Sequence, residues 1–298
     1  MAIRAPRSEA PAWLGSAAAA MMLTFDVDAE APLLADDPGH GANAMLMAHQ
    51  SFGPLVGVPR ILELLAEQEV RATFFVPGVT AERHPSALES ILAADHEVGH
   101  HSHSHPRYVD LEAAEEEEDF ERGLEVLRRF GVDVRGHRTP LSSASPRTAG
   151  LVARHGLSYE STLMDDDRPY RLMTGEGSII ELPPYWGLDD WLQYVNLPVS
   201  ESFRVKPVAD VIAGWQLELE ALRREGGLCV LTMHPFAHGR GSRMRGLRAL
   251  IADARAAGDV VFLTGAEAAR RAEADPALAV RELVRLLPDP DPAVYPAW

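Results

Sequence analysis

The sequence predicts an α/β protein whose parallel strands form a closed or nearly closed barrel. Seven or eight short apolar segments alternate with segments of helical period, the order that parallel strands with crossover helices require. Polar clusters follow several of these apolar segments in succession, and the carboxyl ends of barrel strands share one mouth. With 298 residues, 46% of them hydrophobic and 24% charged, the chain is large enough for such a core. An open doubly wound sheet is the alternative.

Short, nearly continuous apolar runs predict strands that are buried on both faces, as in a parallel sheet. The predicted strands, in chain order, are 21–25, 72–76, 97–98, 134–140, 179–182, 228–233 and 260–263. The first strand runs into Asp26-Val27-Asp28, and side chains two apart on a strand share a face. Both carboxylates are therefore expected to point into one cleft, with Val27 packed behind them.

Apolar residues at intervals of three and four predict the helices that connect these strands. The predicted helices are 58–70, 86–94, 111–130, 146–155, 208–225, 247–257 and 266–287, the last with a break near Pro276. The acidic run 115–118 is expected to be a solvated helix face. Residues 31–54 contain glycine, proline and asparagine with little periodicity, which predicts a long loop.

Three regions follow from this pattern. Residues 1–18 are expected to be a loose leader rich in proline and alanine, 19–287 a single catalytic barrel domain, and 288–298 a proline-rich tail. Arg4, Arg7 and the apolar stretch 17–23 superficially look like a secretory signal. Cleavage there would remove the strand that carries the aspartates, so we expect no export signal and a cytoplasmic protein.

Charge and cysteine content narrow the function classes. The net charge of −16 argues against nucleic acid or an anionic membrane as a partner. No run approaches the roughly 20 apolar residues that a membrane-spanning helix needs. The single cysteine, Cys229, allows no internal disulfide, so nitrogen and oxygen atoms would have to hold any metal.

The densest chemical signal is the stretch 98–106, Val-Gly-His-His-Ser-His-Ser-His-Pro, which holds four of the twelve histidines. Imidazole is a good ligand for a borderline divalent metal. His101 and His105 are four apart, so one helical turn would place both on the same side of a single ion. A polar surface turn that binds metal only adventitiously is the alternative.

Asp28 with His101 and His105 would complete a two-histidine, one-carboxylate set with positions left for water and substrate, the form of a catalytic metal site. A divalent ion there lowers the pKa of its water and polarises a carbonyl oxygen, as amide or ester hydrolysis requires. Asp26, close by but not a ligand, is expected to act as the general base, and His234 to return a proton to the leaving amine.

Two further polar residues are expected to support the base. Arg138 would hold Asp26 ionised through a charge-assisted pair, and Asp166 or a neighbour would orient Arg138. The loop 183–191 mixes aromatic and acidic residues, and its Trp186 and Trp191 are either core plugs or a substrate wall.

These residues also lie in motifs that resemble those of the polysaccharide deacetylase (NodB homology) family. The matching segments are Thr24-Phe25-Asp26-Val27-Asp28, His101-Ser102-His103-Ser104-His105, Arg138-Thr139-Pro140 and Leu231-Thr232-Met233-His234-Pro235. They occur in the family's order and spacing, and the resemblance runs from about Met21 to Ala269. It implies a distorted (β/α)7 barrel that removes N- or O-acetyl groups, with Asp26 as base, Asp28, His101 and His105 as metal ligands, and His234 as acid.

One motif departs from the commonest form of the family. Val27 separates the two aspartates where many members read Asp-Asp-Gly, and Glu30 follows. This is similar to the branch that includes Helicobacter-type peptidoglycan deacetylase and the cyclic-imide and allantoin hydrolases. The branch implies a small amide or an acetylated amino sugar as substrate and a homo-oligomer, dimer or tetramer, with the segment 31–54 and the tail from Pro288 as candidate contacts.

Several residues near the motifs have less certain roles. Glu30, Asp166, Trp186, Trp191 and Ser102 are expected to bind or orient the substrate. His100, His103 and His137 are expected either beside the site or at the surface.

The sequence does not decide which metal is bound or which reaction is catalysed. Zinc is the first expectation for the metal, and cobalt, manganese and iron suit the same ligands. A metal-dependent hydrolase of a carbon–nitrogen bond, on an N-acetyl group or a small linear or cyclic amide, is the main hypothesis. A peptidoglycan or polysaccharide N-deacetylase, a metal-dependent esterase and a non-catalytic carbohydrate-binding or metal-storage member of the fold are the rivals.

Overall fold

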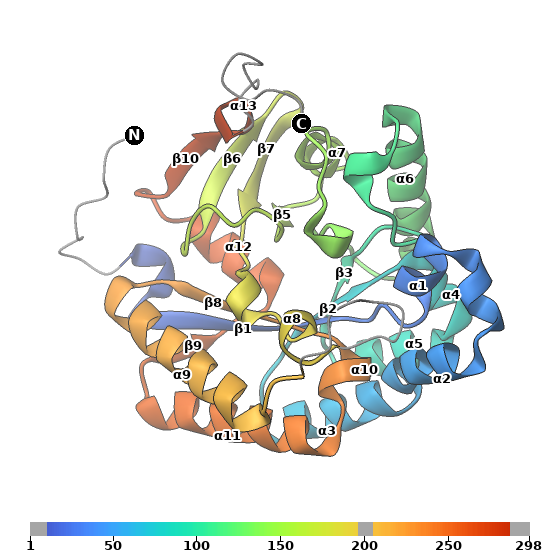
Figure 1. The fold of residues 1–298 in the computed structure, drawn as a ribbon. Helices are drawn as coiled ribbons and strands as arrows, with labels where there is room; N and C mark the ends of the chain where they lie inside the picture. Colours follow the sequence, from blue (N-terminus) through green and yellow to red (C-terminus); the bar gives the residue numbers. More distant parts are fainter. Residues whose placement is uncertain (1–10, 196–204, 287–298) are drawn as a thin grey trace, which may run out of the picture.

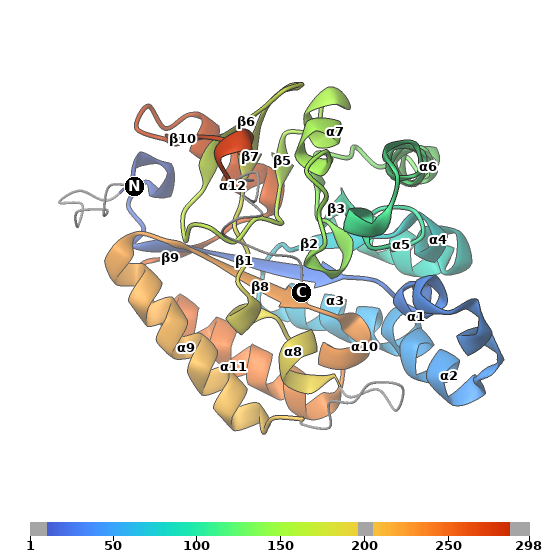
Figure 2. The ribbon, with the colours of Figure 1, turned by 45° about the horizontal axis from the view of Figure 1, so that its top comes forward.

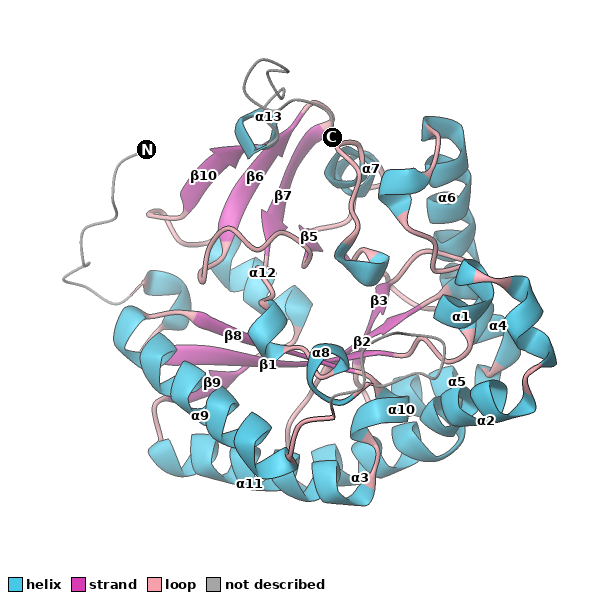
Figure 3. Cartoon of the chain, in the orientation of Figure 1, coloured by secondary structure: helices cyan, strands magenta, loops and turns pink. Residues whose placement is uncertain are grey.

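The computed structural model describes residues 11–195 and 205–286. Its strands form one sheet (Figure 3). They are β1 (Ala19–Asp26), β2 (Thr73–Val76), β3 (Glu97–His100), β4 (Gly136–His137), β5 (Tyr159–Glu160), β6 (Tyr170–Thr174), β7 (Gly177–Glu181), β8 (Leu228–Met233), β9 (Val260–Phe262) and β10 (Ala279–Glu282).

The strand order is β10-β6-β7-β5-β4-β3-β2-β1-β8, with β9 paired to β1 beside β2. All pairings are parallel except that of the β6–β7 hairpin. After β7 the chain crosses to the far edge strand β8 and makes one isolated bridge, between Asp189 and Thr232. The sheet therefore curves into the distorted parallel barrel that was predicted (Figure 1).

Helices surround this sheet. They are α1 (Ala31–Asp36), α2 (Ala44–Phe52), α3 (Val58–Glu67), α4 (Gly78–Arg83), α5 (Pro85–Ala93), α6 (Ala113–Arg129), α7 (Thr148–Arg154), α8 (Trp191–Tyr194), α9 (Val208–Glu225), α10 (Pro235–His238), α11 (Gly241–Ala257), α12 (Gly265–Glu273) and α13 (Leu283–Leu286). Helices α3, α9 and α11 lie along one side of β1, β8 and β9 (Figure 2). None of the helices in the described ranges is both long and apolar enough to cross a membrane.

Strand β1 pairs with β2, β8 and β9 and is buried on both faces. All eight of its residues are buried, since helices cover one face and the barrel interior the other. Phe25 of β1 stacks on Phe74 of β2, with the ring centroids 5.0 Å apart. The apolar sequence of such strands is what made them predictable, and their carboxyl ends carry the polar clusters described below.

The predicted long loop over 31–54 is wrong. It contains α1 and α2, the 3-10 helix η2 (Pro38–Ala42) and part of a π-helical turn, η3 (Gly53–Gly57). The side chain of Asn43 accepts a hydrogen bond from the backbone N–H of Leu46 and so caps α2. These helices are too short for a clear apolar period, which is why the pattern was missed.

The predicted C-terminal helix over 266–287 is also wrong in its second half. Helix α12 ends at Glu273, and the chain then forms the edge strand β10 before the short α13. The hairpin strand β6, to which β10 pairs, was missed as well. Both strands lie at the outer part of the sheet, where burial is partial and the sequence lacks a continuous apolar run.

Two smaller expectations need correction. Glu116 is not part of a solvated face: it is fully buried, and its carboxylate accepts hydrogen bonds from Ser145 (2.7 Å) and Thr148 (2.6 Å). The leader is not loose over residues 11–18, because Trp13 and Leu14 are buried and the Trp13 N–H donates to Asp275 at 3.1 Å. Residues 1–10 and the predicted tail 288–298 lie outside the described residues.

Candidate active site

A cavity of about 330 Å³ lies at the carboxyl ends of the strands. Asp26 and Asp28 reach it from β1, His101 and His105 from the loop after β3, and His234 from the end of β8. These side chains are up to about 200 positions apart in the sequence, and the shared mouth of the barrel brings them together.

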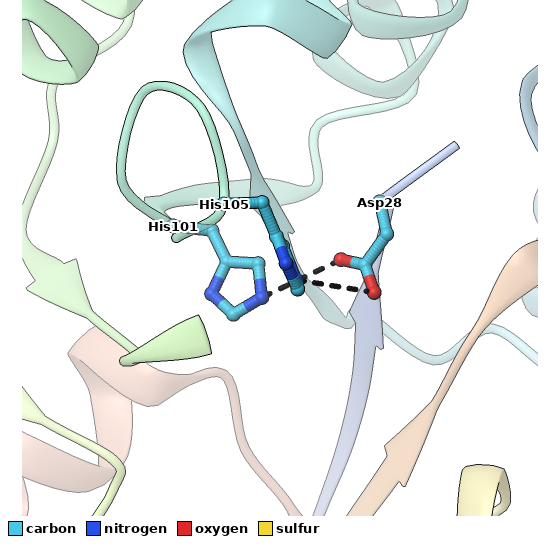
Figure 4. Close-up of side chains that lie close together, drawn as sticks. All are labelled: Asp28, His101 and His105. Atoms are coloured by element: carbon cyan, nitrogen blue, oxygen red, sulfur yellow. Dashed lines mark ion pairs between the residues drawn. The ribbon is translucent and has the colours of Figure 1, made fainter. Parts of the chain in front are cut away.

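Asp28, His101 and His105 form a fully buried group of potential metal ligands (Figure 4). All three are buried, and one ligand atom from each lies within 4.8 Å of the others. The Asp28 carboxylate lies 3.4 Å from Nε2 of His101 and 3.4 Å from Nε2 of His105. Ligand atoms about 2.0–2.2 Å from a tetrahedral ion lie about 3.3–3.6 Å apart, so the spacing fits one metal ion.

The hydrogen bonding also fits a metal ion. Nδ1 of His101 donates to the carbonyl oxygen of Arg138 at 2.7 Å, so in the neutral imidazole Nε2 is the unprotonated nitrogen that can coordinate a metal. Asp28 Oδ1 and His105 Nε2 are sealed from solvent and have no hydrogen-bond partner. Buried polar atoms without partners are costly, and a cation among them would satisfy all three residues.

Asp28 has the charge that a ligand needs. Burial by itself would raise the pKa of its carboxyl, but the charge of His105 and the contacts with His101 and His234 lower that pKa well below the usual range. The carboxyl is therefore ionised near neutral pH.

A loop, and not the predicted helical turn, presents the two histidines. Ser102 (φ 65°) and His105 (φ 64°) have left-handed backbone conformations, which no helix contains. The Ser102 hydroxyl oxygen accepts the backbone N–H of His105 at 2.9 Å, and Asp119 of α6 accepts the N–H groups of His103 and Ser104. Ser102 thus orients a ligand and not the substrate, since it does not line the cavity.

Asp26 is held by Arg138, as the sequence predicted. One guanidinium nitrogen of Arg138 lies 2.9 Å from Asp26 Oδ1 and 2.7 Å from the Thr24 hydroxyl. The other nitrogens donate to the Ser161 hydroxyl and carbonyl, and the guanidinium stacks on Phe75 at 4.4 Å. The second oxygen of Asp26 lies 3.9 Å from Nε2 of His101, beside the candidate metal position.

The predicted role of Asp166 is wrong. Asp166 accepts backbone N–H groups of Asp167 and Arg168 and pairs with Arg281 of β10, away from the cavity. Asp165 likewise binds the Tyr170 hydroxyl at 2.6 Å. Ser161, and not one of these aspartates, orients Arg138. No local sequence pattern marks Ser161 for this role.

On the opposite wall His234 is paired with Asp190, a residue that sequence reasoning did not single out. The His234 Nδ1 donates to Asp190 Oδ1 at 2.7 Å, and Nδ1 of His238 contacts the other oxygen at 3.0 Å. Burial would lower the pKa of His234, but the hydrogen bond and charge of Asp190, with Asp28 and Asp189, raise it to about 10. The imidazole is therefore protonated near neutral pH, with Nε2 3.5 Å from Asp28.

Of the remaining residues predicted to contact the substrate, two line the cavity and one does not. Trp186 and Trp191 both line the cavity; Trp186 is exposed at its rim, and its Nε1 lies 3.4 Å from the Ser142 hydroxyl. Glu30 does not line it: its carboxylate pairs with His84 at 2.8 Å and Arg83 at 3.5 Å, beside α4. The predicted substrate role of Glu30 is therefore wrong.

The other three histidines of this region are buried, so none is a surface residue. His100 and His137 contact each other through their Nδ1 atoms at 2.9 Å, and His137 Nε2 contacts the Thr139 hydroxyl at 3.2 Å. Burial lowers the pKa of both. They pack behind His101 and Arg138 and do not line the cavity.

Several known proteins are similar to this chain. Residues 52–159 match the family model described as polysaccharide deacetylase. A peptidoglycan deacetylase of Helicobacter pylori is 28% identical over 217 residues, which cover 63% of this chain and 74% of that protein. The solved structure of the allantoinase Puue, at 22% identity and a TM-score of 0.77, covers 91% of this chain and 98% of its own, and shows the shared fold alone.

A protein of Mycobacterium smegmatis assigned to the polysaccharide deacetylases resembles this chain over nearly its whole length. Its solved structure is 42% identical to this chain with a TM-score of 0.89, over 96% of this chain and all of that one. Sequence identity at that level over nearly the whole chain means that this chain belongs to the polysaccharide deacetylase family.

Proposed function

We propose that this protein is a metal-dependent hydrolase of carbon–nitrogen bonds other than peptide bonds, acting on an N-acetyl group or on a small linear or cyclic amide. Membership of the polysaccharide deacetylase family supports the hydrolase class. The observation that carries the proposal is the convergence of three buried ligand residues, Asp28, His101 and His105. The carboxylate of Asp26 lies beside His101, and the imidazolium of His234 lies beside Asp28.

Asp28, His101 and His105 would hold the metal. A divalent ion there would lower the pKa of a water molecule and polarise the amide carbonyl. Zinc suits the two imidazoles and one carboxylate best, and cobalt, manganese or iron would fit the same ligands.

The protein's own groups account for the proton transfers. Asp26, paired with Arg138, would accept the proton of the attacking water through the oxygen that faces His101. His234, kept protonated by Asp190, would donate a proton from Nε2 to the leaving nitrogen. Both groups line the same cavity as the three candidate ligands, Asp26 beside His101 and His234 beside Asp28.

Two substrate classes are each supported by one observation. The cavity of about 330 Å³, walled by Trp186 and Trp191, favours a small amide or a single acetylated amino sugar. The relation to a peptidoglycan deacetylase favours an acetylated glycan. A cytoplasmic location and a homo-oligomeric state remain predictions from the sequence, as does the single catalytic domain over 19–287.

The test is hydrolysis by protein that has been stripped of metal and reconstituted with each candidate ion. N-acetylglucosamine, chitooligosaccharides, N-acylated amines and cyclic imides form the substrate panel. We expect turnover to need metal, and we expect Asp26→Asn to keep the metal while the rate falls by about 10²–10⁴-fold.

A non-catalytic carbohydrate-binding protein would behave differently. Its ligand binding would survive both Asp26→Asn and His234→Ala, and no member of the panel would be turned over. Turnover that persists at full rate after complete metal removal would refute the metal-dependent proposal.

A further inference from the structure

The cavity contains one acidic side chain that the proposed reaction does not use. Asp189 lies between the 3-10 helix η6 (Trp186–Leu188) and α8, where the chain bridges to β8 at Thr232. Its side chain lines the cavity and is 18% exposed.

Only one oxygen of Asp189 has a partner among the described residues. Oδ1 accepts the backbone N–H of Trp191 at 2.8 Å and lies 4.0 Å from Nδ1 of His234. Oδ2 makes no hydrogen bond within the ranges 11–195 and 205–286, and it is not among the atoms sealed from solvent. A carboxylate oxygen is therefore left for a ligand in the cavity.

In the described part of the chain, no arginine or lysine in the cavity is free to match a negatively charged substrate, and the protonated His234 that lines it is already paired with Asp190. Arg138 is the only arginine or lysine among the described residues that line it. Its guanidinium already donates to Asp26, Thr24 and Ser161. A carboxylate or phosphate on the substrate would thus meet Asp189 without a compensating side chain.

We propose that Asp189 is a specificity-determining residue that selects substrates with an N–H or O–H donor beside the scissile amide and rejects those with a carboxylate there. This rests on the proposed hydrolase function and names the substrate class: neutral amides with a second donor. A charged acceptor binds such a donor strongly, and a like charge in a partly buried site is repelled strongly.

The charge state supports this role. Burial raises the pKa of Asp189 to about 6, while the charge of His234 acts against that rise and the charge of Asp190 adds to it. The carboxyl is therefore mainly ionised at pH 7.5, where it accepts hydrogen bonds.

The test compares two probes of nearly equal size, N-acetylglycinamide and N-acetylglycine, which differ in charge at one end. Binding to zinc-loaded Asp26→Asn protein is measured by calorimetry at pH 7.5, with and without the further change Asp189→Asn. Metal contacts contribute equally in both proteins, so the change in the ratio of the two dissociation constants reports on Asp189. The amide that replaces the carboxylate keeps an oxygen for the Trp191 N–H and offers an N–H to the carboxylate of the probe.

We expect Asp189→Asn to shift that ratio by about tenfold towards N-acetylglycine. Asp253→Asn, on the exposed face of α11 and bound to Gln216, is the matched control and should leave the ratio unchanged. A shift of less than twofold, an equal shift in the control, or failure of both probes to bind would overturn the inference. Because binding is measured without turnover, these outcomes are separate from a failure of the protein to hydrolyse any amide.

Discussion

The two walls of the cavity are built in different ways. The β1–β3 wall, made of Asp26, Asp28, His101 and His105, sits directly at the ends of buried parallel strands. The η6–α8 wall, residues 185–191, is an irregular segment that joins the barrel through one bridge and through the contact of Asp190 with His234. The proposed metal binding therefore depends on the first wall, while the orientation of His234 and the proposed choice of substrate depend on the second.

Removing a ligand from the β1–β3 wall should have the largest effect. We expect His101→Ala to lower the bound metal and to reduce kcat/KM by at least about 10³-fold, because ligand, base and acid act as a unit. Metal analysis and steady-state kinetics would measure this. His40→Ala, outside the cavity, is the control, and full metal occupancy in His101→Ala would contradict the assigned ligand set.

Asp190→Asn tests the η6–α8 wall. The change removes the charge that keeps His234 protonated and oriented, so kcat should fall by about 10–100-fold while the metal content stays unchanged. A loss as large as that of His101→Ala, accompanied by loss of metal, would show that the two walls are not separable in this way.

A third prediction concerns the pH dependence of the free energy of unfolding, to which the buried Glu160 contributes. Burial raises the pKa of Glu160, on β5, to about 7, against the hydrogen bonds from Thr162 and Thr139 that lower it. The folded protein therefore binds more protons than the unfolded chain between about pH 4.5 and 7, so stability should fall as pH rises through this window. The span of roughly 2.5 pH units corresponds to on the order of 3 kcal/mol.

Glu160→Gln should reduce that pH dependence, since the amide cannot ionise; burial and the charge of Glu160 also raise the pKa of Glu181, which contributes the remainder. Denaturant unfolding at pH 5, 6, 7 and 8 would measure it, with Glu118→Gln on the exposed face of α6 as control. A variant that loses stability with rising pH as steeply as the parent protein would rule Glu160 out as the cause.

The smallest effect is expected from the packing behind the histidine loop. A Cβ at Gly123 of α6 would lie 2.5 Å from the carbonyl oxygen of Ser102 and 2.5 Å from Nε2 of His100. Gly123→Ala should therefore cost about 1–3 kcal/mol and weaken metal binding by displacing the loop. Gly214→Ala, where a Cβ on α9 meets nothing within 4 Å, is the matched control and should stabilise slightly.

Much of the β1–β3 wall could be predicted from the sequence. The strand ending at Asp26, the ligand candidates Asp28, His101 and His105, and the pairing of Arg138 with Asp26 were all predicted, and the structure brings these residues together. Apolar runs predict buried strands, and four histidines within nine residues are a local pattern that indicates a metal site. The expected helical turn was wrong because hydrogen bonds to Asp119 and Ser102 hold the loop, and these do not show in spacing.

The η6–α8 wall was harder to predict. The pattern 183–191 indicated only a mixture of aromatic and acidic residues, and nothing in it distinguished Asp190, which binds His234, from Asp189, which lines the cavity. The same limit led to the wrong roles for Glu30 and Asp166, whose partners His84 and Arg281 lie 54 and 115 positions away.

By itself, the sequence determined the parallel barrel, the bounds of its most buried elements such as β8 and α9, and the residue types available for hydrolysis. Periodicity and burial act over a few neighbouring residues, so they can be read along the chain. Only the tertiary structure decided that Asp190 supports His234 and that Ser161 orients Arg138. Each choice depends on a hydrogen bond between distant segments, and the partners meet only when the barrel closes.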